Sequence, residues 1–531
     1  ILDPTRFDVG NGDLHTVLLG PAERADVIVD FSQYAGKTLI LYNDAPAAFP
    51  AGIVSYDYYT GGPDLTSTGG APTTQLGYGP DTRTIMQIKV GPSVGASPYN
   101  FAALQAVFAK TASKRGVFEV SQEPVIIPQA NYNSAYNKVF PADTFVRIQD
   151  SSKIFTTISG TVMDIAFQPK ALHDEQGAAF DQYGRMSGFL GLENTITTGA
   201  VQNFVMYGYA SPPVDLLKDS MTPMSEPSPG DGTQIWKITH NGVDTHPLHV
   251  HLFNVQLINR VTWDGRILQP DATELGWKET FRTSPLEDTI VAMRPVAPTL
   301  PFEIPNSIHL IDPTMPEGKV LDGPALNGFL DPQMEPVTVI NHLVNYGWEY
   351  AWHCHILGHE EMDMMHSMLF AVAPVPPVNL NAVNVSPNSN LRVNVSWTDN
   401  SLSETGFYVL KSTTSTGPWA TLAYIPSNTG PQKGARITYT DTTGTPGTSY
   451  YYCSLASNLI GDTAIYAPPS IGFPKMEVNS KPSNVAGVAD INSAKIGIYK
   501  DGIWYLDYNG NFMWDGVPPD RQYFFTGSGS G

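Results

Sequence analysis

The run His353-Cys354-His355-Ile356-Leu357-Gly358-His359, followed by Met364, gathers three kinds of metal-ligand side chain within twelve residues. Upstream lies a second run, His246-Pro247-Leu248-His249-Val250-His251. One cysteine, two histidines and a weak axial thioether form the ligand set of a blue copper centre. The predicted ligands of that centre are Cys354, His359, His246 and Met364.

Four histidines of the two runs are left over: His249, His251, His353 and His355. Successive side chains of a β-strand point to opposite faces. If Cys354 faces one way, its neighbours His353 and His355 face the other. A second metal cluster can therefore form behind the first.

The two motifs closely resemble those of the multicopper oxidase family, of the bacterial spore-coat laccase and bilirubin oxidase-like type with three domains. The match is to the last cupredoxin domain of that family. The resemblance implies that His246 binds the blue type 1 copper, His249 the type 2 copper and His251 one of the type 3 pair.

The same resemblance assigns roles to the second motif. His353 and His355 would bind the type 3 coppers, and His359 would complete the blue site with Met364 as its axial ligand. Glu360 follows His359 and would pass protons to the oxygen-reducing cluster. The alternative for Glu360 is a solvated acidic face shared with Glu361 and Asp363. The residues predicted to act in catalysis are Cys354, His359 and Glu360.

Other metal sites fit less well. A structural zinc site with two cysteines fails because only one cysteine is available beside these histidines, and the His-Glu-x-x-His motif of zinc proteases does not occur. The histidines outside the motifs are interpreted as structural; they are His15, His173, His240, His309, His342 and His366.

Composition indicates an all-β protein. The 531 residues include 47 Gly and 44 Pro, which implies many turns, and 42% are hydrophobic, which is enough for several cores. We expect cupredoxin-type Greek-key β-sandwiches, then a fibronectin type III (Ig-like) β-sandwich and a short β-rich tail. The second cysteine, Cys453, has no disulfide partner once Cys354 binds copper.

The net charge of -20 disfavours nucleic acid and anionic membranes as partners. An acidic surface would instead attract cations, including oxidisable metal ions. No apolar stretch approaches the length of a membrane span. We expect an extracellular, cell-surface or periplasmic location, with any export signal upstream of Ile1.

The domains expected are residues 1-90, the second half of a middle cupredoxin domain; 91-139, a linker or insertion; 140-373, the C-terminal cupredoxin domain with the copper ligands; 377-470, the fibronectin type III domain; and 480-531, a β-hairpin repeat fragment and Gly/Ser tail. Strands are expected between residues 14 and 44.

The fibronectin resemblance implies Trp397 as the core tryptophan and Tyr450 or Tyr452 as the corner tyrosine. Asp501-Gly502 predicts a hairpin, and residues 507-511 a turn in preference to a calcium loop.

The resemblance implies an oxidase that takes single electrons from a substrate at the type 1 copper and reduces O2 to water at a trinuclear type 2/type 3 cluster. Metal ions such as Mn(II) or Fe(II) and phenols are both compatible substrates. Relatives supply two further His-x-His pairs from a first domain, which this chain lacks. We therefore expect an N-terminal half as a bound partner. Two alternatives stay open: a cell-surface copper electron-transfer or assembly protein without the complete cluster, and a copper nitrite reductase-like enzyme.

Overall fold

The computed structural model describes residues 17-45, 49-50, 61-68, 72-75, 83-92, 97-133, 152-174, 187-194, 203-222, 225-263, 266-323, 328-385, 391-427, 430-445, 448-488, 497-507, 514-517 and 520-524. Three predictions fall on other residues. His15, the turn at 508-511 and the Gly/Ser tail at 527-531 lie outside the described part of the chain.

The chain divides into two compact units, and each is described by itself. The first unit comprises Ile1–Thr299, Ser307–Phe370 and Gly461–Lys475, and the second comprises Leu300–Asn306, Ala371–Ile460 and Met476–Gly531. Each unit thus contains a short segment that lies, in sequence, within the other. A single cut between residues 373 and 377 does not separate them, and the predicted domain boundaries stay predictions.

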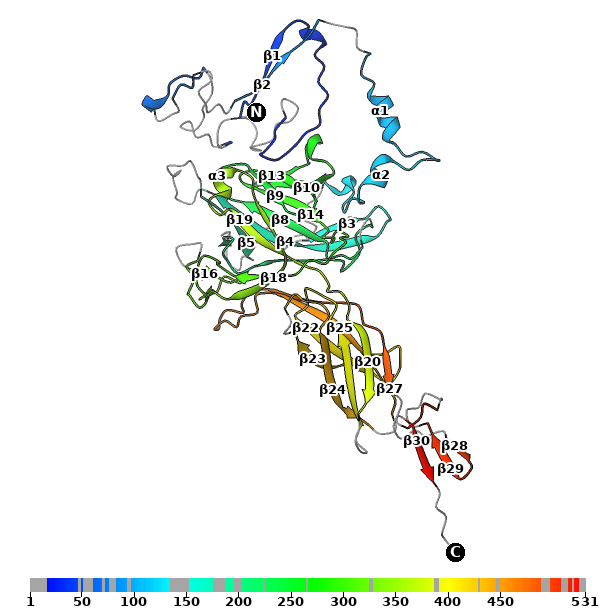
Figure 1. Ribbon diagram of the computed structural model, residues 1–531. Coiled ribbons are helices and arrows are strands. Elements are labelled where there is room, and N and C mark those ends of the chain that lie inside the picture. Colours follow the sequence, from blue (N-terminus) through cyan, green and yellow to red (C-terminus); the bar gives the residue numbers. More distant parts are fainter. Residues whose placement is uncertain are drawn as a thin grey trace, which may run out of the picture. The chain divides into compact units, whose positions relative to one another are not determined.

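The first unit contains a mainly antiparallel sheet in the order β11-β10-β14-β8-β4-β5-β6 (Figure 1). Its strands are β3 Ser152–Thr156, β4 Val162–Asp174, β5 Gly188–Asn194, β6 Asn203–Tyr207, β8 Gln234–His240, β10 Val255–Thr262, β11 Ile267–Leu268, β12 Trp277–Lys278 and β14 Glu287–Met293. Strands β4 and β8 pair in parallel. All of β10 and nearly all of β8 are buried, as expected for strands covered on both faces.

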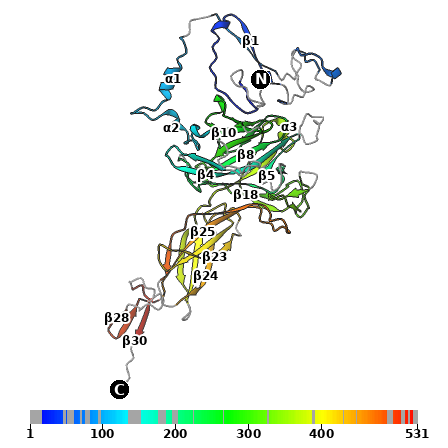
Figure 2. The same ribbon diagram turned by 180° about the vertical axis from the view of Figure 1, so that it is seen from behind.

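A second layer of the first unit carries the two histidine motifs. Its strands are β7 Asp215–Lys218, β9 His246–Val250, β13 Thr280–Thr283, β15 Ser307–Leu310, β18 Leu343–Cys354 and β19 Met365–Ala371. The order β13-β9-β18-β19 is antiparallel throughout, and Figure 2 shows β18 of this layer from behind. Trp236 of β8 meets Trp352 of β18 edge to face at 5.2 Å, which joins the two layers. A small ladder, β16 Phe329–Leu330 with β17 Pro336–Val337, belongs to the same unit.

The N-terminal part of the chain differs from the prediction. The strands expected at residues 17-31 are not formed; the described strands nearby are β1 Thr38–Tyr42 and β2 Thr84–Lys89, which pair with each other. A strand needs a neighbouring strand for its backbone hydrogen bonds, and no described strand forms a backbone ladder with residues 17-31. The predicted linker at 91-139 contains helices α1 Phe101–Phe108 and α2 Val117–Ser121.

The end of that linker belongs to the core of the first unit. The buried amides of Ile126 and Ile127 both donate to Oε1 of Gln256, at 3.0 Å each. Ile126, Ile127 and Tyr132 are almost fully buried in the hydrophobic cluster of this unit. Residues 126-132 are therefore a packed element of the first unit and not a free connection.

The second unit is a β-sandwich. One sheet contains β20 Val378–Asn384, β21 Leu391–Thr398 and β24 Arg436–Gly444; the other contains β22 Gly406–Ser412, β23 Ala420–Pro426, β25 Tyr450–Gly461, β26 Lys475–Asn479 and β27 Ala486–Val488. Trp397 of β21 is 1% exposed and contacts Phe407 of β22, between the sheets. The Tyr450 hydroxyl accepts a hydrogen bond from the Thr445 amide, five residues upstream. Tyr450, not Tyr452, thus makes the backbone contact of a tyrosine corner.

The tail forms a three-stranded sheet of β28 Gly497–Lys500, β29 Ile503–Leu506 and β30 Arg521–Phe524. Asp501 and Gly502 both have positive φ, as the predicted two-residue hairpin requires. Strands dominate both units, which confirms the predicted all-β fold class. No helix in the described ranges is long and apolar enough to span a membrane.

Candidate metal centre

The two histidine motifs meet because β9 and β18 are neighbouring strands. In their antiparallel register His353 stands opposite His249, and Cys354 stands opposite Leu248. Alternation along each strand then sends Cys354 and His246 to one side and their neighbours to the other. One strand pair therefore supplies side chains to two separate groups.

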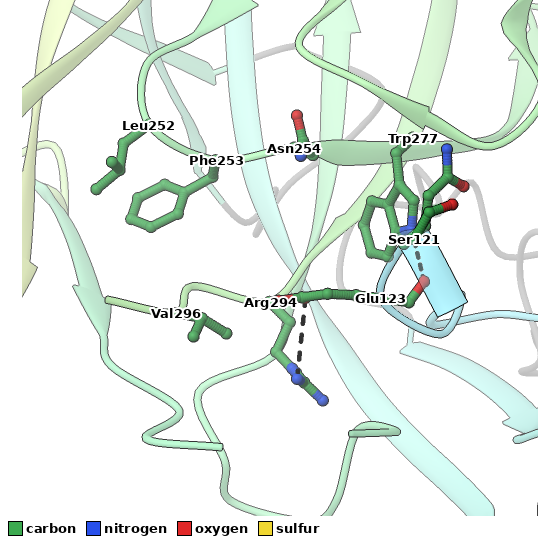
Figure 3. Close-up of a pocket in the computed structure, with 9 residues that line it drawn as sticks. Ser121, Glu123, Leu252, Phe253, Asn254, Trp277, Arg294 and Val296 are labelled. Atoms are coloured by element: carbon green, nitrogen blue, oxygen red, sulfur yellow. Dashed lines mark hydrogen bonds and ion pairs between the residues drawn. The ribbon is translucent and has the colours of Figure 1, made fainter. Parts of the chain in front are cut away.

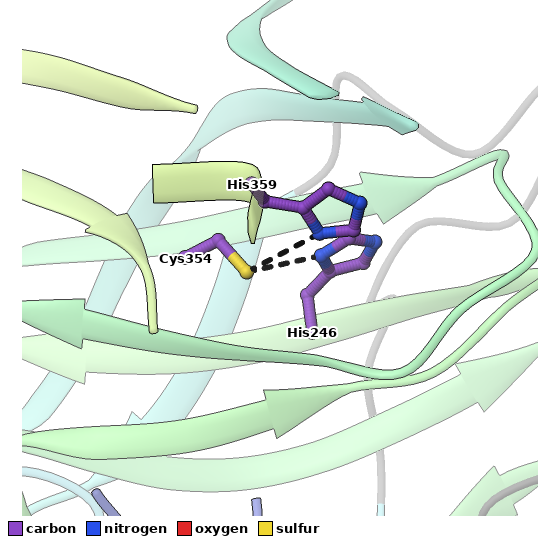
Figure 4. A group of neighbouring side chains, drawn as sticks. All are labelled: His246, Cys354 and His359. Carbon is purple, nitrogen blue, oxygen red and sulfur yellow. Dashed lines mark hydrogen bonds between the residues drawn. The ribbon is translucent and has the colours of Figure 1, made fainter. Parts of the chain in front are cut away.

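The first group consists of His246, Cys354 and His359, all of them buried (Figure 4). The Cys354 Sγ atom lies 3.2 Å from Nδ1 of His246 and 3.8 Å from Nδ1 of His359. The two imidazole rings are 4.6 Å apart and inclined by 30°. The three ligand atoms thus converge on one point between the strands and the loop after β18.

These spacings fit a bound metal ion. Nitrogen and sulfur ligands about 2.0 to 2.3 Å from one first-row ion lie roughly 3.2 to 4.0 Å from each other. Burial, with His246 nearby, lowers the pKa of His359 to about 3, so its imidazole is neutral at pH 7, as metal binding requires. Burial raises the pKa of the Cys354 thiol, so a metal must displace its proton. The soft thiolate and imidazole donors suit copper.

A short loop holds His359 and Met364. Helix α3 Leu357–Glu360 follows β18, and the Met364 amide donates a hydrogen bond to the His359 carbonyl at 3.0 Å. The Cys354 amide in turn donates to the Met364 carbonyl at 3.1 Å. Met364 is fully buried, and its backbone is bonded to both Cys354 and His359; its role as axial ligand stays a prediction.

Sequence reasoning missed a further residue of this group. Asp174, the last residue of β4, places its carboxylate 2.6 Å from Nε2 of His246. It also accepts the amides of Val243 and Asp244, at 2.9 and 3.0 Å. Burial alone would raise the pKa of Asp174, but the hydrogen bond and charge of His246 hold it well below its usual range. The ionised carboxylate therefore accepts a hydrogen bond from Nε2–H, and Nδ1 of His246 faces the sulfur.

The second group consists of His249, His251 and His353. Nδ1 of His249 lies 2.9 Å from the Glu279 carbonyl, and Nδ1 of His353 lies 3.0 Å from the Cys354 carbonyl. A carbonyl accepts only from N–H, so both rings keep Nε2 free to bind a metal. The Nε2 atoms of His251 and His353 are 3.1 Å apart. Burial and the neighbouring histidines lower the pKa of His249 to about 4.

His355 and Glu360 border this second group. The His355 ring lies 5.0 Å from that of His353 and 5.3 Å from that of His249. A Glu360 carboxylate oxygen lies 3.6 Å from Nδ1 of His353 and 3.8 Å from Nδ1 of His355. Glu360 thus turns toward the histidines, where a proton carrier is expected, although its role stays a prediction.

Residues near the N-terminus of the chain reach the strands of the site. The Glu23 carboxylate pairs with Arg282 of β13 at 3.0 Å, and Arg24 pairs with Glu279. A Cβ atom added to Gly20 would lie only 2.7 Å from the Pro247 side chain, within the first histidine motif. The segment around residues 20-24 is therefore fixed against β9 and β13.

The first unit contains a pocket of about 410 Å³ (Figure 3). Leu252, which follows His251, lines it together with Trp277 and Arg294. Two of its polar side chains already have partners: Trp277 donates to the Glu123 carbonyl at 3.0 Å, and the Arg294 guanidinium donates to the Thr222 carbonyl at 2.7 Å. None of the predicted copper ligands lines this pocket.

Four of the histidines expected to be structural, namely His240, His309, His342 and His366, have polar partners outside the two ligand groups. His309 pairs with Glu349 at 3.0 Å, His342 with Asp462 at 2.9 Å and His366 with Asp215 at 3.2 Å. His240 packs against His246, but the Gly242 amide donates to its Nδ1, and its Nε2 lies 2.5 Å from the Asp244 carbonyl. Neither ring nitrogen of His240 is left to bind a metal.

Comparison with known proteins supports the predicted resemblance. The chain is 22% identical to a laccase of Bacillus subtilis (strain 168) over 370 residues, 67% of this chain and 42% of the laccase. It is 28% identical to a laccase of Bacillus stratosphericus over 182 residues, 33% of this chain and 27% of the laccase. The chain thus spans less than half the length of these curated relatives. No family model matches it.

Solved structures that resemble parts of the chain include a multicopper oxidase from Campylobacter jejuni, described as a metallo-oxidase, with 13% identity, a TM-score of 0.21, and coverage of 38% of this chain and 29% of that one. A Fn3-like protein from Clostridium thermocellum has 26% identity and a TM-score of 0.15, and covers 23% of this chain and 99% of its own. The sequence relatives confirm the resemblance to the multicopper oxidases at the level of the family.

Proposed function

We propose that this relative of the multicopper oxidases is the C-terminal part of a copper oxidase that uses O2 as electron acceptor. One observation carries the proposal: adjacent residues of a single strand, His353 and Cys354, enter two different ligand groups. One group has the donors of a type 1 copper site, and the other has imidazole nitrogens alone. The peptide bond between the two residues joins the groups covalently.

Copper would supply the one-electron chemistry at both groups, and four electrons with four protons reduce O2 to two waters. The residues of the chain then have separate tasks. His246, Cys354 and His359 exclude water from the first group by their burial. The backbone from Cys354 to His353 gives the electron a short path between the groups. Glu360 would hold a proton beside His353 and His355.

The second group needs ligands from elsewhere. His249, His251, His353 and His355 cannot by themselves hold the three coppers of a trinuclear cluster. We propose that a polypeptide with two His-x-His pairs, equivalent to the N-terminal half of a three-domain oxidase, binds this chain. The pair β1 and β2 offers an apolar surface for it, because Ile40, Tyr42 and Ile85 are each more than half exposed.

The proposed reducing substrate is a metal ion such as Mn(II) or Fe(II), or a phenol. The net charge of -20 favours approach by cations and leaves neutral phenols unaffected. We also propose that the protein works outside the cytoplasm, at the cell surface, in the periplasm or in the medium.

The experiment is to purify residues 1-531, load copper, and measure copper content, visible absorption and O2 uptake with Mn(II), Fe(II) and a phenol. The measurement is repeated after adding a polypeptide with the two His-x-His pairs. We expect one blue copper for the chain alone, and further copper with O2 uptake only when the partner is present. A chain that binds no copper, or that alone binds four coppers and reduces O2, contradicts the two-part enzyme.

Glu360 has a matched control next to it. Glu360→Gln should slow O2 reduction by the assembled enzyme, by about 10²-fold or more, and leave the blue absorption unchanged. Glu361 is exposed, so Glu361→Gln should alter neither. Equal rates for the two variants would assign Glu360 to the solvated acidic face.

A second function, electron transfer or assembly at the cell surface without a complete cluster, is favoured by the small number of histidines in the second group. It predicts a blue copper that cycles with a redox partner but no O2 uptake, even with the added polypeptide. A nitrite reductase-like site is less well supported, because its mononuclear centre does not need histidines on both sides of the cysteine. Nitrite consumption by the copper-loaded chain would favour it.

A further inference from the structure

We infer that the last pair of the β4–β5 ladder, Asp174 and Gly188, positions two ligands of the mononuclear site and thereby sets its reduction potential. The two residues stand opposite each other in the ladder. Asp174 contacts His246, and Gly188 faces Met364. This inference rests on the proposed function, since it concerns the copper bound by these residues.

The hydrogen bonds of Asp174 hold the His246 imidazole in one orientation. Its Oδ2 accepts both Nε2–H of His246 and the amide of Asp244, and its Oδ1 accepts the amide of Val243. With three donors in place, the carboxylate has no freedom to turn away. The imidazole must present Nδ1 to Cys354, at the observed 3.2 Å. A carboxylate behind a histidine ligand fixes its tautomer and makes it a stronger donor.

The neighbours of the pair support this role. His240 lies 5.1 Å from the His246 ring, but its Nδ1 accepts a hydrogen bond from the Gly242 amide at 2.8 Å, so the ring is neutral and brings no charge to the site. The Asp174 and His246 side chains are both fully buried, so solvent does not screen their contact. The negative charge of Asp174 therefore acts directly on the imidazole and favours the more oxidised metal.

Gly188 acts on the other side of the site by its lack of a side chain. A Cβ atom there would lie 2.6 Å from Sδ of Met364 and 3.4 Å from its Cγ and Cε. Gly188 is buried and has no positive φ, so backbone strain does not explain why a glycine stands at this position. The close approach of the Met364 thioether explains it. The space left at Gly188 lets the Met364 sulfur take its position.

The first test compares Asp174→Asn and Asp174→Glu with the unaltered chain, all copper-loaded. Asp174→Asn keeps the shape and removes the charge, so we expect a higher reduction potential, altered EPR hyperfine splitting and copper affinity lower by about 10- to 100-fold. Asp174→Glu restores the charge and should recover most of the affinity. If Asp174→Asn acted only by disturbing the structure, Asp174→Glu would not recover the copper affinity.

The control is Asp215→Asn. Asp215 is also buried in the same unit, but its carboxylate contacts Lys170, Trp352 and His366, none of which is a predicted copper ligand. The substitution Asp215→Asn should lower thermal stability and leave the EPR spectrum unchanged. A wild-type spectrum and potential in Asp174→Asn, or an equal spectral change in Asp215→Asn, would overturn the role of Asp174.

The second test combines Gly188→Ala with Met364→Leu. Leucine keeps most of the volume of methionine but has no sulfur, so an effect of Gly188→Ala through the thioether should disappear in the double variant. We expect Gly188→Ala to shift the potential in the unaltered background and to leave it unchanged in Met364→Leu. The same shift in both backgrounds overturns the role of Gly188.

These outcomes separate the inference from the function on which it rests. If the unaltered chain binds copper without an intense visible band, the type 1 assignment fails before any variant is compared. If the band is present and the variants behave like the unaltered chain, the copper site stands and only the outer contacts are wrong.

Discussion

Cys354 supplies the thiol of the first ligand group. Cys354→Ser removes the thiolate that would give the copper centre its charge-transfer colour but keeps the volume of the side chain. We expect a folded, colourless protein and a visible absorption reduced at least tenfold. Cys453→Ser is the matched control, because Cys453 is also free and buried but lies in the second unit. An intense band that survives Cys354→Ser is incompatible with the assignment.

The pair His342 and Asp462 makes the stability of the first unit depend on pH. The hydrogen bond to Asp462 raises the pKa of His342 above its ordinary 6.5. A raised folded-state pKa stabilises fully below the unfolded value, and this contribution is lost as the pH rises through the folded value. The stability difference between the unaltered chain and His342→Gln should be about 0.5 kcal/mol larger at pH 5.5 than at pH 9. Urea unfolding at both pH values measures it, and an equal difference contradicts it.

The ligands within each histidine motif could be predicted from sequence because they follow local rules, whereas the family resemblance joined the two motifs, since His246 and Cys354 lie 108 residues apart. Spacing within twelve residues fixes Cys354 relative to His359, and strand alternation fixes His353 on the opposite side. Asp174 could not be predicted in this way. It lies 72 residues from His246 in sequence, and only the path of β4 past β8 brings the two together. A single aspartate at the end of a strand carries no signal of its own.

At the scale of elements, the β5–β6 ladder depends on a glycine. A Cβ atom at Gly191 of β5 would overlap the Val205 carbonyl of β6, where the strands pair. Gly191→Ala should therefore lower the free energy of unfolding by about 1 to 3 kcal/mol. Gly91→Ala is the control, since no atom lies near its added Cβ and it should change stability by less than about 0.5 kcal/mol. Equal urea midpoints for the two variants would contradict the overlap.

The elements that the sequence predicted are those with strong local patterns. Strand β18 ends at Cys354, as the predicted alternation of ligands around that residue requires, and the hairpin forms at Asp501 and Gly502. The strands expected at 17-31 failed because apolar residues alone do not supply a bonding partner. The core role of residues 126-132 was missed because it depends on Gln256, 124 residues or more away.

At the scale of the whole molecule, the returning segment Gly461–Lys475 stabilises the first unit. The Asp331 carboxylate accepts a hydrogen bond from the Ser470 hydroxyl at 2.7 Å, and Phe473 is buried against Tyr207. A chain ending at Ala373 loses these contacts. We expect its first unit to be less stable by about 2 kcal/mol or more, the contribution of one buried aromatic side chain.

A chain ending at Val488 is the control, because it keeps the returning segment and lacks only the tail sheet. Thermal unfolding of the three chains, followed by tryptophan fluorescence, makes the comparison. The chain ending at Val488 should resemble the full chain. If the chain ending at Ala373 does so too, the segment contributes nothing to the first unit.

The returning segment also imposes an order on synthesis. Every predicted copper ligand of this chain has left the ribosome's active centre once Met364 is made, yet Lys475 follows about 110 residues later. At roughly 5 to 20 residues per second, the nascent first unit waits ~5 to 20 s before its last segment arrives. During that interval the ligand strands are present in an unfinished domain. Nascent chains stalled before residue 461 should therefore be cleaved by protease within the first unit, whereas chains released after Lys475 should resist.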